Sequence, residues 1–318
     1  MTPIIPGSCC PSSLIARIVL ASVVLGAGAG AADLHARRME IVQTPNGQET
    51  VFRDSVTIVD GSTLITARFA RFNESRGVAV VSESVRIVDP RSRVEADSAV
   101  YRLDARVTEL FGRVRVELDS LSIAAPHLLY FVEEGRVEAD DGLEIRTPGN
   151  GLTLRGARGR YWMDSRVGEV DSQPELVISE GDSVTAGART MTWHGEDGSA
   201  LLAGGVRVGT RATSLTADSL YWWTRADTGV AWGSPRVADS LSSTTGDTIR
   251  LAVESGALRR VAVTGGAQGR YRSTGTSEVE VAGEVITIRL ERGELDVVEV
   301  ERLARGWLVE RGGGEPGS

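Results

Sequence analysis

The sequence predicts an all-β protein of about 16 antiparallel strands, arranged as about eight copies of one two-stranded unit. Three observations predict this fold class. Glycine is abundant, with 37 residues among 318, whereas aromatic residues make up only 5% of the chain. Apolar and polar residues alternate with period two in many short segments, as half-buried strands require. A small residue followed five positions later by a large one recurs along the chain at intervals of 29 to 37 residues.

Residues 1–32 have the layout of a secretory signal peptide. Arg17 precedes the apolar run Ile18–Leu25, and small residues with A-x-A spacing follow that run. The run is shorter than the roughly 20 residues that a membrane-spanning helix needs, although an uncleaved N-terminal anchor is the alternative. Cys9 and Cys10 both precede the run, so the lipoprotein arrangement, with its cysteine after the run, is not expected. Cleavage would leave a chain without cysteine.

Three further segments complete the predicted domain organisation. Residues 33–50 are expected to be a linker, residues 51–305 the repeat domain, and residues 306–318 a flexible glycine-rich tail. The small residues of the repeat are Ala67, Ala96, Ala125, Ala157, Ala188, Ala217, Gly246 and Gly283, and their large partners are Phe72, Tyr101, Tyr130, Trp162, Trp193, Trp222, Leu251 and Ile288.

Each unit is predicted to contain a strand, a polar turn, a strand that ends in the large residue, and a second turn. The segment Val85–Val88 followed by Val94–Tyr101 is one example. Many copies place a glycine five residues after the large residue, which favours a turn there: Gly77, Gly135, Gly198, Gly256 and Gly293.

One parity of these strands forms an apolar ladder. The large residue of each pair falls on the opposite parity unless a bulge intervenes. A small residue at the same height of every unit suits a place where two facing sheets converge. The ladder is either a dry core or a ligand groove, and the pattern alone leaves both open. Its candidate groove residues are Ile65, Ala67, Phe69, Val94, Ala96, Val100, Ile123, Ala125, Leu129, Val184, Ala186, Ala188, Leu215, Ala217 and Tyr221.

Two segments, Val85–Glu117 and Val206–Ser234, resemble the OstA/LptA-like repeat. The shared features are a recurrent Ala-Asp-Ser followed by a tyrosine, at 96–101 and 217–221, and an acidic or glycine turn before the next strand. The resemblance covers residues 51–265, and a weaker copy extends to Arg302. The chain departs from it in the 37-residue offset of its last unit and in the weak strand character of residues 240–250.

The resemblance implies an elongated, twisted, V-shaped β-jelly-roll in the periplasm. It implies a role in lipopolysaccharide transport and outer-membrane assembly, with the acyl chains of lipid A in an apolar groove. The implied partners are other jelly-roll transport proteins, joined by strand addition at open edges, and further copies of the chain joined head to tail. Attachment to the inner or outer membrane is compatible with this location.

Composition and motifs exclude several function classes. A formal charge of −8 with interspersed arginines argues against a nucleic-acid surface. His35, His127 and His194 do not have the spacing of metal ligands, and no catalytic or nucleotide-binding motif is present, so neither an enzyme nor a cofactor is expected. The alternatives left open are a structural β-solenoid or adhesin with a dry interior, an outer-membrane β-barrel, and a repeat-built polysaccharide enzyme.

Overall fold

The computed structural model describes residues 33–310 except 61, 91, 103, 119–120, 132, 148–151, 179–182, 255–256, 273–276 and 292–293. Within this part the regular elements are 26 β-strands that pair antiparallel, which confirms the all-β prediction. No helix in the described part is long and apolar enough to cross a membrane. The predicted signal segment, residues 1–32, and the end of the predicted tail, residues 311–318, lie outside the described residues.

The chain divides into two compact units, where a single repeat domain was expected. Unit 1 comprises residues 1–145 and 158–166, and unit 2 comprises residues 146–157 and 167–318. The strands of unit 1 are β1 (Asp33–His35), β2 (Arg38–Thr44), β3 (Gly47–Asp60), β4 (Thr63–Asn73), β5 (Val78–Val88), β6 (Ser92–Arg102), β7 (Val107–Leu118), β8 (Ser122–Phe131), β9 (Arg136–Ala139) and β12 (Arg158–Trp162).

Strand β10 (Leu143–Thr147) includes the boundary between the units. The strands of unit 2 are β11 (Leu152–Gly156), β13 (Val167–Asp171), β14 (Glu175–Ile178), β15 (Val184–Gly187), β16 (Thr190–His194), β17 (Ser199–Gly209), β18 (Ser214–Trp223), β19 (Thr228–Trp232), β20 (Arg236–Ala238), β21 (Ser242–Thr245), β22 (Thr248–Glu254), β23 (Ala257–Arg272), β24 (Ser277–Glu291), β25 (Glu294–Glu301) and β26 (Arg305–Glu310).

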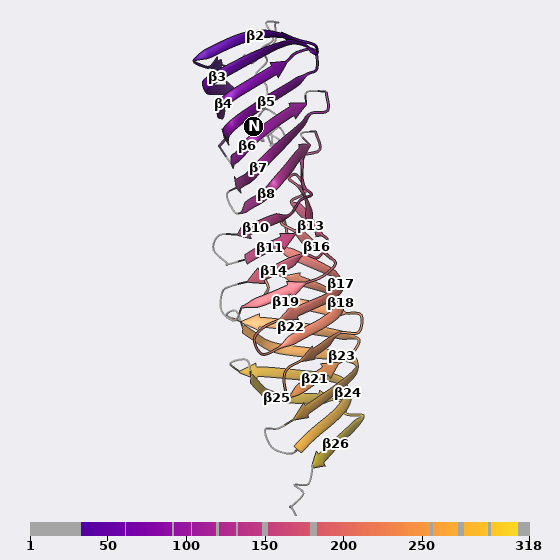
Figure 1. Ribbon diagram of the computed structural model, residues 1–318. Coiled ribbons are helices and arrows are strands. Elements are labelled where there is room, and N and C mark those ends of the chain that lie inside the picture. The colour runs from indigo at the N-terminus through magenta and orange to yellow at the C-terminus, as the bar shows by residue number, and fades with distance from the viewer. Residues whose placement is uncertain are drawn as a thin grey trace, which may run out of the picture. The chain divides into compact units, whose positions relative to one another are not determined.

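Each rung of the sheet, by which we mean one long strand or the two consecutive short strands that take its place, pairs with the rung before it and the rung after it along the chain. In unit 1, β3 to β8 follow one another as antiparallel neighbours (Figure 1). In unit 2, two consecutive short strands often take the place of one long strand: β14 pairs with β15 while β13 pairs with β16. The described strands outnumber the 16 expected because many rungs are divided at a bend.

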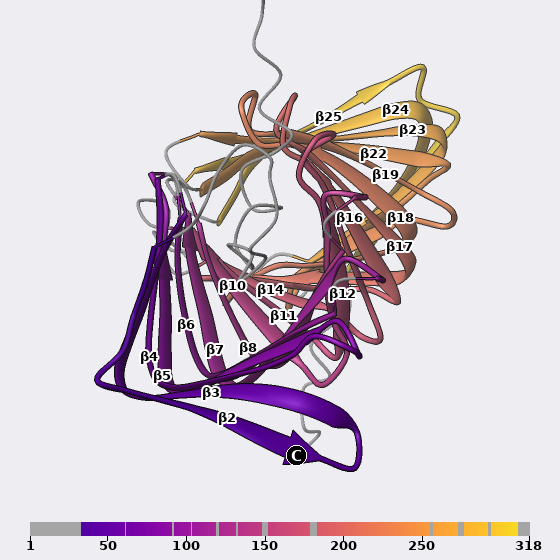
Figure 2. The same ribbon diagram turned by 90° about the horizontal axis from the view of Figure 1, so that it is seen from above.

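Every second rung contains a β-bulge at this bend. Between β5 and β6, Glu83 and Ser84 together lie opposite the single residue Asp97, and both have a φ of 66°. A bulge of this kind bends the strand and divides the rung into two arms, which Figure 2 shows for unit 1. The equivalent pairs with positive φ are Asp54 and Ser55, Gly112 and Arg113, Ser172 and Gln173, Gly204 and Gly205, Gly233 and Ser234, and Gly265 and Gly266.

The bend reverses the alternation of inward and outward side chains. In β4, Ile65 and Ala67 are buried before the bend, whereas Ala70 is buried after it and Phe69 is only half-buried. The side chains on the inner face of the two arms pack into a hydrophobic core in unit 1 that extends from Phe52 to Tyr130.

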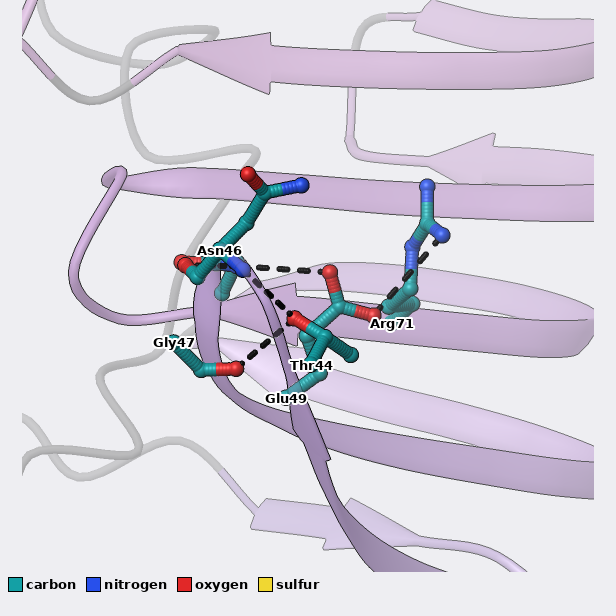
Figure 3. Close-up of polar contacts among 6 residues, drawn as sticks. Thr44, Asn46, Gly47, Glu49 and Arg71 are labelled. Carbon is teal, nitrogen blue, oxygen red and sulfur yellow. Dashed lines mark hydrogen bonds and ion pairs between the residues drawn. The ribbon is translucent and has the colours of Figure 1, made fainter.

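The turns at the ends of the rungs also contact each other. Thr44 Oγ1 donates a hydrogen bond to the carbonyl oxygen of Gly47 and accepts one from the Asn46 amide, which closes the β2–β3 turn (Figure 3). The side-chain amide of Asn73, at the end of β4, donates a hydrogen bond to the backbone carbonyl oxygen of Asn46 in the β2–β3 turn. Glu49 lies 3.8 Å from the guanidinium of Arg71 on the neighbouring strand.

Two of the expected segment boundaries differ from the structure. Residues 33–50, expected to be a linker, form β1, β2 and the first residues of β3. Residues 306–310, expected to begin a flexible tail, form most of β26, which pairs with β24. Sequence alternation is weak in both segments because edge strands pack on only one neighbour and need less apolar surface.

Candidate binding face

Most small residues of the repeat lie at the bend, on the inner face. Ala67, Ala96 and Ala125 are all buried, and each pairs across the sheet with a buried valine that follows a bulge. These valines are Val56, Val85 and Val114. Valines and alanines therefore alternate from rung to rung where the two arms converge, and a larger residue in place of an alanine would overfill this space.

Unit 2 repeats the pairing of a buried valine with a small residue at the bend, and the arms lie close together there. Val206 pairs with Ala217, and both are buried. At Gly246, an added Cβ would lie 2.5 Å from Cγ1 of Val263, so the position admits glycine alone without movement of its neighbours. Convergence of the arms thus accounts for the small residue in these copies, whereas Ala157 of the fourth copy is exposed and Ala188 of the fifth is half-buried.

Except in the fourth copy, the large residues of the repeat lie on the inner face near the end of one arm, which we call the aromatic arm. In unit 1, Phe72 and Tyr101 both pair with Ala79, and Thr108 pairs with both Tyr101 and Tyr130. Each large side chain is therefore separated from the next by a smaller residue on the intervening strand. This spacing leaves room for one bulky group in every second rung.

In unit 2 the equivalent aromatic residues are tryptophans that lie beside glycines. Trp193 pairs with Gly168, and Trp222 pairs with Gly229. A Cβ added to Gly229 would lie 2.4 Å from the Trp222 ring, so the indole occupies the space that a side chain would need.

In the fourth copy the inward-facing aromatic residue is Tyr161 rather than the expected Trp162. Tyr161 pairs with Val137, which packs against the core, whereas the neighbouring Arg160 forms an ion pair with Glu138. Trp162 shares the outward parity of Arg160. This copy is longer than its predecessors, and the pattern of small and large residues is shifted by one.

The tyrosines of the inner face in unit 1 are shielded from water by burial. Burial raises the pKa of the Tyr130 hydroxyl to about 12, with a smaller contribution from the negative charge of Asp164. Burial also raises the pKa values of Tyr101 and Tyr161, although Arg106 and Arg166 respectively oppose the change. The inner face of unit 1 is therefore a low-dielectric environment that favours uncharged groups.

The structure buries nine of the fifteen candidate groove residues: Ile65, Ala67, Val94, Ala96, Ile123, Ala125, Ala186, Leu215 and Ala217. Val184 and Ala188 are half-buried. The remaining four, Phe69, Val100, Leu129 and Tyr221, were expected on the same face as the small residues that precede them. They lie beyond the bend and point outward, because the bulge opposite each strand reverses the alternation.

The surroundings of three of these residues, Phe69, Val100 and Leu129, are polar. The Arg53 guanidinium lies 5.1 Å from the centre of the Phe69 ring. Val100 and Leu129 both pair with Glu109, whose carboxylate accepts hydrogen bonds from Arg102 and lies 3.0 Å from Nε2 of His127. Such charged groups belong to a solvated outer face.

Sequence reasoning missed the inward residues that lie beyond the bend. The residue three positions after the small one is buried in several copies. These residues are Ala70, Ala99, Leu128 and Leu220. The available signal was a pair of polar or glycine residues in the middle of every second strand, such as Glu83–Ser84 and Gly112–Arg113, 29 residues apart. Such a pair is typical of a bulge rather than of a regular strand.

The described residues contain no group of three or more His, Cys, Asp or Glu side chains that could hold a metal ion. His127 stacks on Phe111, with ring centroids 4.9 Å apart, and contacts Glu109. Unit 2 contains a small cavity of about 30 Å³, lined in part by Thr244, Val261 and Ile288. A volume of this size holds about one water molecule.

No protein-family model matches the chain, and no curated protein matches it. A solved structure that resembles part of the chain is the crystal structure of LptH, the LptA homologous periplasmic component of the conserved lipopolysaccharide transport device from Pseudomonas aeruginosa. The similarity covers 37% of this chain and 94% of that chain, with 17% sequence identity and a TM-score of 0.34.

Proposed function

We propose that this chain is a periplasmic, non-catalytic carrier that holds the acyl chains of lipopolysaccharide along its inner face. One observation carries the proposal: the inner face is apolar from rung to rung. Among the described residues the buried charged side chain is Asp89, which hydrogen-bonds to Ser92 at a turn rather than facing the apolar core. The recurrent Ala-Asp-Ser motif followed by a tyrosine supports the same ligand.

Acyl chains suit such a face because no polar group is needed to hold them. Each buried CH₂ group contributes about 0.8 kcal/mol, and equivalent rungs offer successive sites of similar affinity. In the structure the inner side chains pack against each other, so binding requires the two arms to move apart. Tyr101 and Tyr130, near the end of the aromatic arm, are the side chains that this movement displaces.

The terminal strands supply the proposed contacts with other jelly-roll proteins. Among the described strands β2 pairs with β3 alone, and its Met39 and Ile41 side chains are 58% exposed. Strands β25 and β26 pair with β24 alone among the described strands. Open edges with exposed apolar side chains accept a further strand from another chain, including a second copy joined head to tail.

Photo-crosslinking from adjacent residues of β8 tests the lipid assignment. A photoreactive phenylalanine analogue at Tyr130 points to the inner face, and the same analogue at Leu129 points outward. In cells that make lipopolysaccharide, we expect lipid crosslinks from position 130 and background signal from position 129. Thermal unfolding followed by circular dichroism checks that both variants fold.

A structural β-solenoid or adhesin with a dry interior is the second candidate. The close packing of Val85 against Ala96 at the bend favours it, because a permanently filled core has no room for a ligand. Background-level crosslinking from both position 129 and position 130, in variants that fold, would contradict the lipid carrier and support this alternative.

A further inference from the structure

The outer face of the aromatic arm in unit 2 differs from the rest of the molecular surface. It is formed by the outward-facing residues of β16, β17, β18, β19, β22 and the adjoining part of β23, and we call it the outer aromatic face. Its central cross-strand row, in order of strands, is Thr192, Leu201, Tyr221, Val230, Arg250 and Ala262.

No carboxylate interrupts this face. Each of the six strands contributes three outward-facing residues in register, and none of them is Asp or Glu. The neighbouring carboxylates lie at its borders: Asp197 and Asp227 in turns, Glu254 at the end of β22 beyond a register shift, and Glu169 and Asp171 on β13, opposite Thr192 and Thr190 of β16. The six strands themselves carry none within the face. In a chain with 43 acidic residues and a formal charge of −8, this is a marked local departure.

The equivalent face of unit 1 has the opposite composition. There Glu49, Glu109 and Glu138 each lie beside an arginine from a neighbouring strand. The outward rings of this face each contact a basic or imidazole group: Phe69 contacts Arg53, Phe111 stacks on His127, and Phe131 contacts Arg136. The outer aromatic face replaces the cross-strand ion pairs with rings and hydroxyl groups, so the ordinary solvated surface of a β-sheet does not explain it.

Three aromatic rings project from this face. Trp223 and Trp232 are 39% and 40% exposed, which is high for tryptophan in the middle of a paired sheet. The ring centroid of Tyr221 lies 4.6 Å from that of Trp223. Tyr221 pairs with Val230, and Trp232 pairs with Ser219, so the three rings belong to two adjacent strands.

The phenol of Tyr221 is fixed in position before any ligand arrives. Its hydroxyl lies 2.6 Å from Oγ of Ser199, and Ser199 in turn donates to Oδ1 of Asp197 at 2.7 Å. Because the Ser199 hydroxyl proton points to Asp197, the Tyr221 hydroxyl donates the hydrogen bond between Tyr221 and Ser199. The bonds from the Ser199 hydroxyl and amide lower the pKa of Asp197, against the opposing effect of its partial desolvation. A pre-positioned ring loses little conformational entropy when a ligand stacks on it.

Arg250 adds a positive charge beside the rings. It pairs with Val230 and is diagonal to Trp232, whose own cross-strand partner is Thr248. A diagonal pair on one face of a sheet lies about 7–8 Å apart, within reach of a long side chain. Arg250 is exposed, and among the described residues it takes part in no ion pair.

We propose that the outer aromatic face binds an acidic saccharide. The apolar face of a sugar ring stacks on exposed indoles, its hydroxyl groups bond to flanking groups such as Thr228 and Thr248, which pair with Trp223 and Trp232, and Arg250 pairs with a carboxylate or phosphate of the ligand. A protein partner suits the face less well, because Leu201 and Val230 are the only large aliphatic residues in its central row. The site is separate from the inner face and does not depend on the proposed lipid carriage.

Tryptophan fluorescence of the full secreted chain tests the proposal, with trigalacturonate as the acidic probe and maltotriose as the neutral probe. We expect trigalacturonate to quench the emission with a Kd of about 1 mM or tighter, and maltotriose to bind at least about tenfold more weakly. Trp232→Ala is expected to weaken trigalacturonate binding about tenfold or more, while Trp232→Tyr keeps a ring for stacking and retains most of it. Arg250→Gln is expected to weaken trigalacturonate binding about tenfold and to abolish the preference over maltotriose.

Trp307→Ala is the matched control, because Trp307 is 51% exposed but lies on β26, away from this face. The control should leave the affinity unchanged, and thermal midpoints should show that all variants fold. Absence of saturable quenching by trigalacturonate up to about 10 mM would overturn the proposal. Equal losses in Trp232→Ala and Trp307→Ala, or equal affinity for the two probes, would overturn it as well.

Discussion

Single residues at the bend determine the path of each rung. In β7, Gly112 has a φ of 69°, and a Cβ there would lie 2.3 Å from Oδ2 of Asp97. The next residue, Arg113, also has a positive φ, and its guanidinium bonds to Asp97 at 2.6 Å. Pro126 occupies the unpaired position of β8 beside the same bend, where the missing N–H costs no ladder hydrogen bond. Glycine, proline and a cross-strand ion pair thus support one bulge.

The two consecutive glycines at the bend of β23 should respond differently to substitution. Both have positive φ, but a Cβ at Gly265 would lie 2.3 Å from Oδ2 of Asp247, whereas nothing lies within 4 Å of one at Gly266. We expect Gly266→Ala to lower the free energy of unfolding by about 1 kcal/mol, from backbone strain, and Gly265→Ala by at least about 2 kcal/mol. Urea unfolding of the two variants measures the difference, and equal losses would contradict the role of Asp247.

The buried tyrosine of β8 makes a prediction about alkaline pH. Because the folded-state pKa of Tyr130 is raised to about 12 by burial, above its ordinary value of 10.0, the neutral phenol favours the folded state. This contribution is complete below pH 10 and is lost as the pH rises through the raised pKa. Ultraviolet titration should show a phenolate transition near pH 12 that Tyr130→Phe removes. A transition that persists in the variant would assign it to another tyrosine.

At the scale of the strand, the bulge decides which residues face the core. Alternation with period two predicted the inward residues before the bend, such as Ile65 and Ala67, and the structure buries both. It failed beyond the bend because two residues on one strand lie opposite a single residue on the next, so the parity of the shorter strand is reversed. The polar or glycine pairs that mark each bulge, such as Glu83–Ser84, are present in the sequence, but alternation alone does not distinguish them from a regular strand.

Alanine substitution of two adjacent leucines in β8 tests this reversal of the inward and outward faces. Leu128 is 2% exposed on the inner face, and Leu129 is half-buried on the outer face beside Glu109. Leu128→Ala is expected to cost 2–5 kcal/mol of the free energy of unfolding, because it leaves a cavity in the core. Leu129→Ala should cost less than about 1.5 kcal/mol, since its neighbours are partly solvated. The reverse order in denaturant unfolding would contradict the assigned faces.

At the scale of the whole chain, rungs interact mainly with their immediate neighbours. Strand β22, for example, pairs with β19 and β23 alone among the described strands. Stability in such an array is a sum of rung and nearest-neighbour terms, so disturbances should decay over a few rungs. The same architecture leaves edges at the terminal strands, which the proposed partners would cover.

A core substitution in unit 2 tests this locality. Ile249 is fully buried in β22. We expect Ile249→Ala to accelerate amide hydrogen exchange in β19, β22 and β23 and to leave β4, β5 and β6 of unit 1 unchanged. Hydrogen exchange followed by mass spectrometry compares the variant with the parent chain. Uniform acceleration across both units would indicate a single cooperative transition and contradict the nearest-neighbour account.

The sequence by itself determined the all-β class, the repeat, its turns and the small residues at the bend, because each follows from local constraints that recur every 29 to 37 residues. Period-two alternation requires strands, glycine permits the turns, and the convergence of two arms admits only small side chains. Tertiary structure decided which residues face inward beyond the bend, the division into two units, and the carboxylate-free outer aromatic face. These features depend on which residues of different rungs pair across the sheet, and that register is set by bulges whose cross-strand partners are determined only in the folded chain.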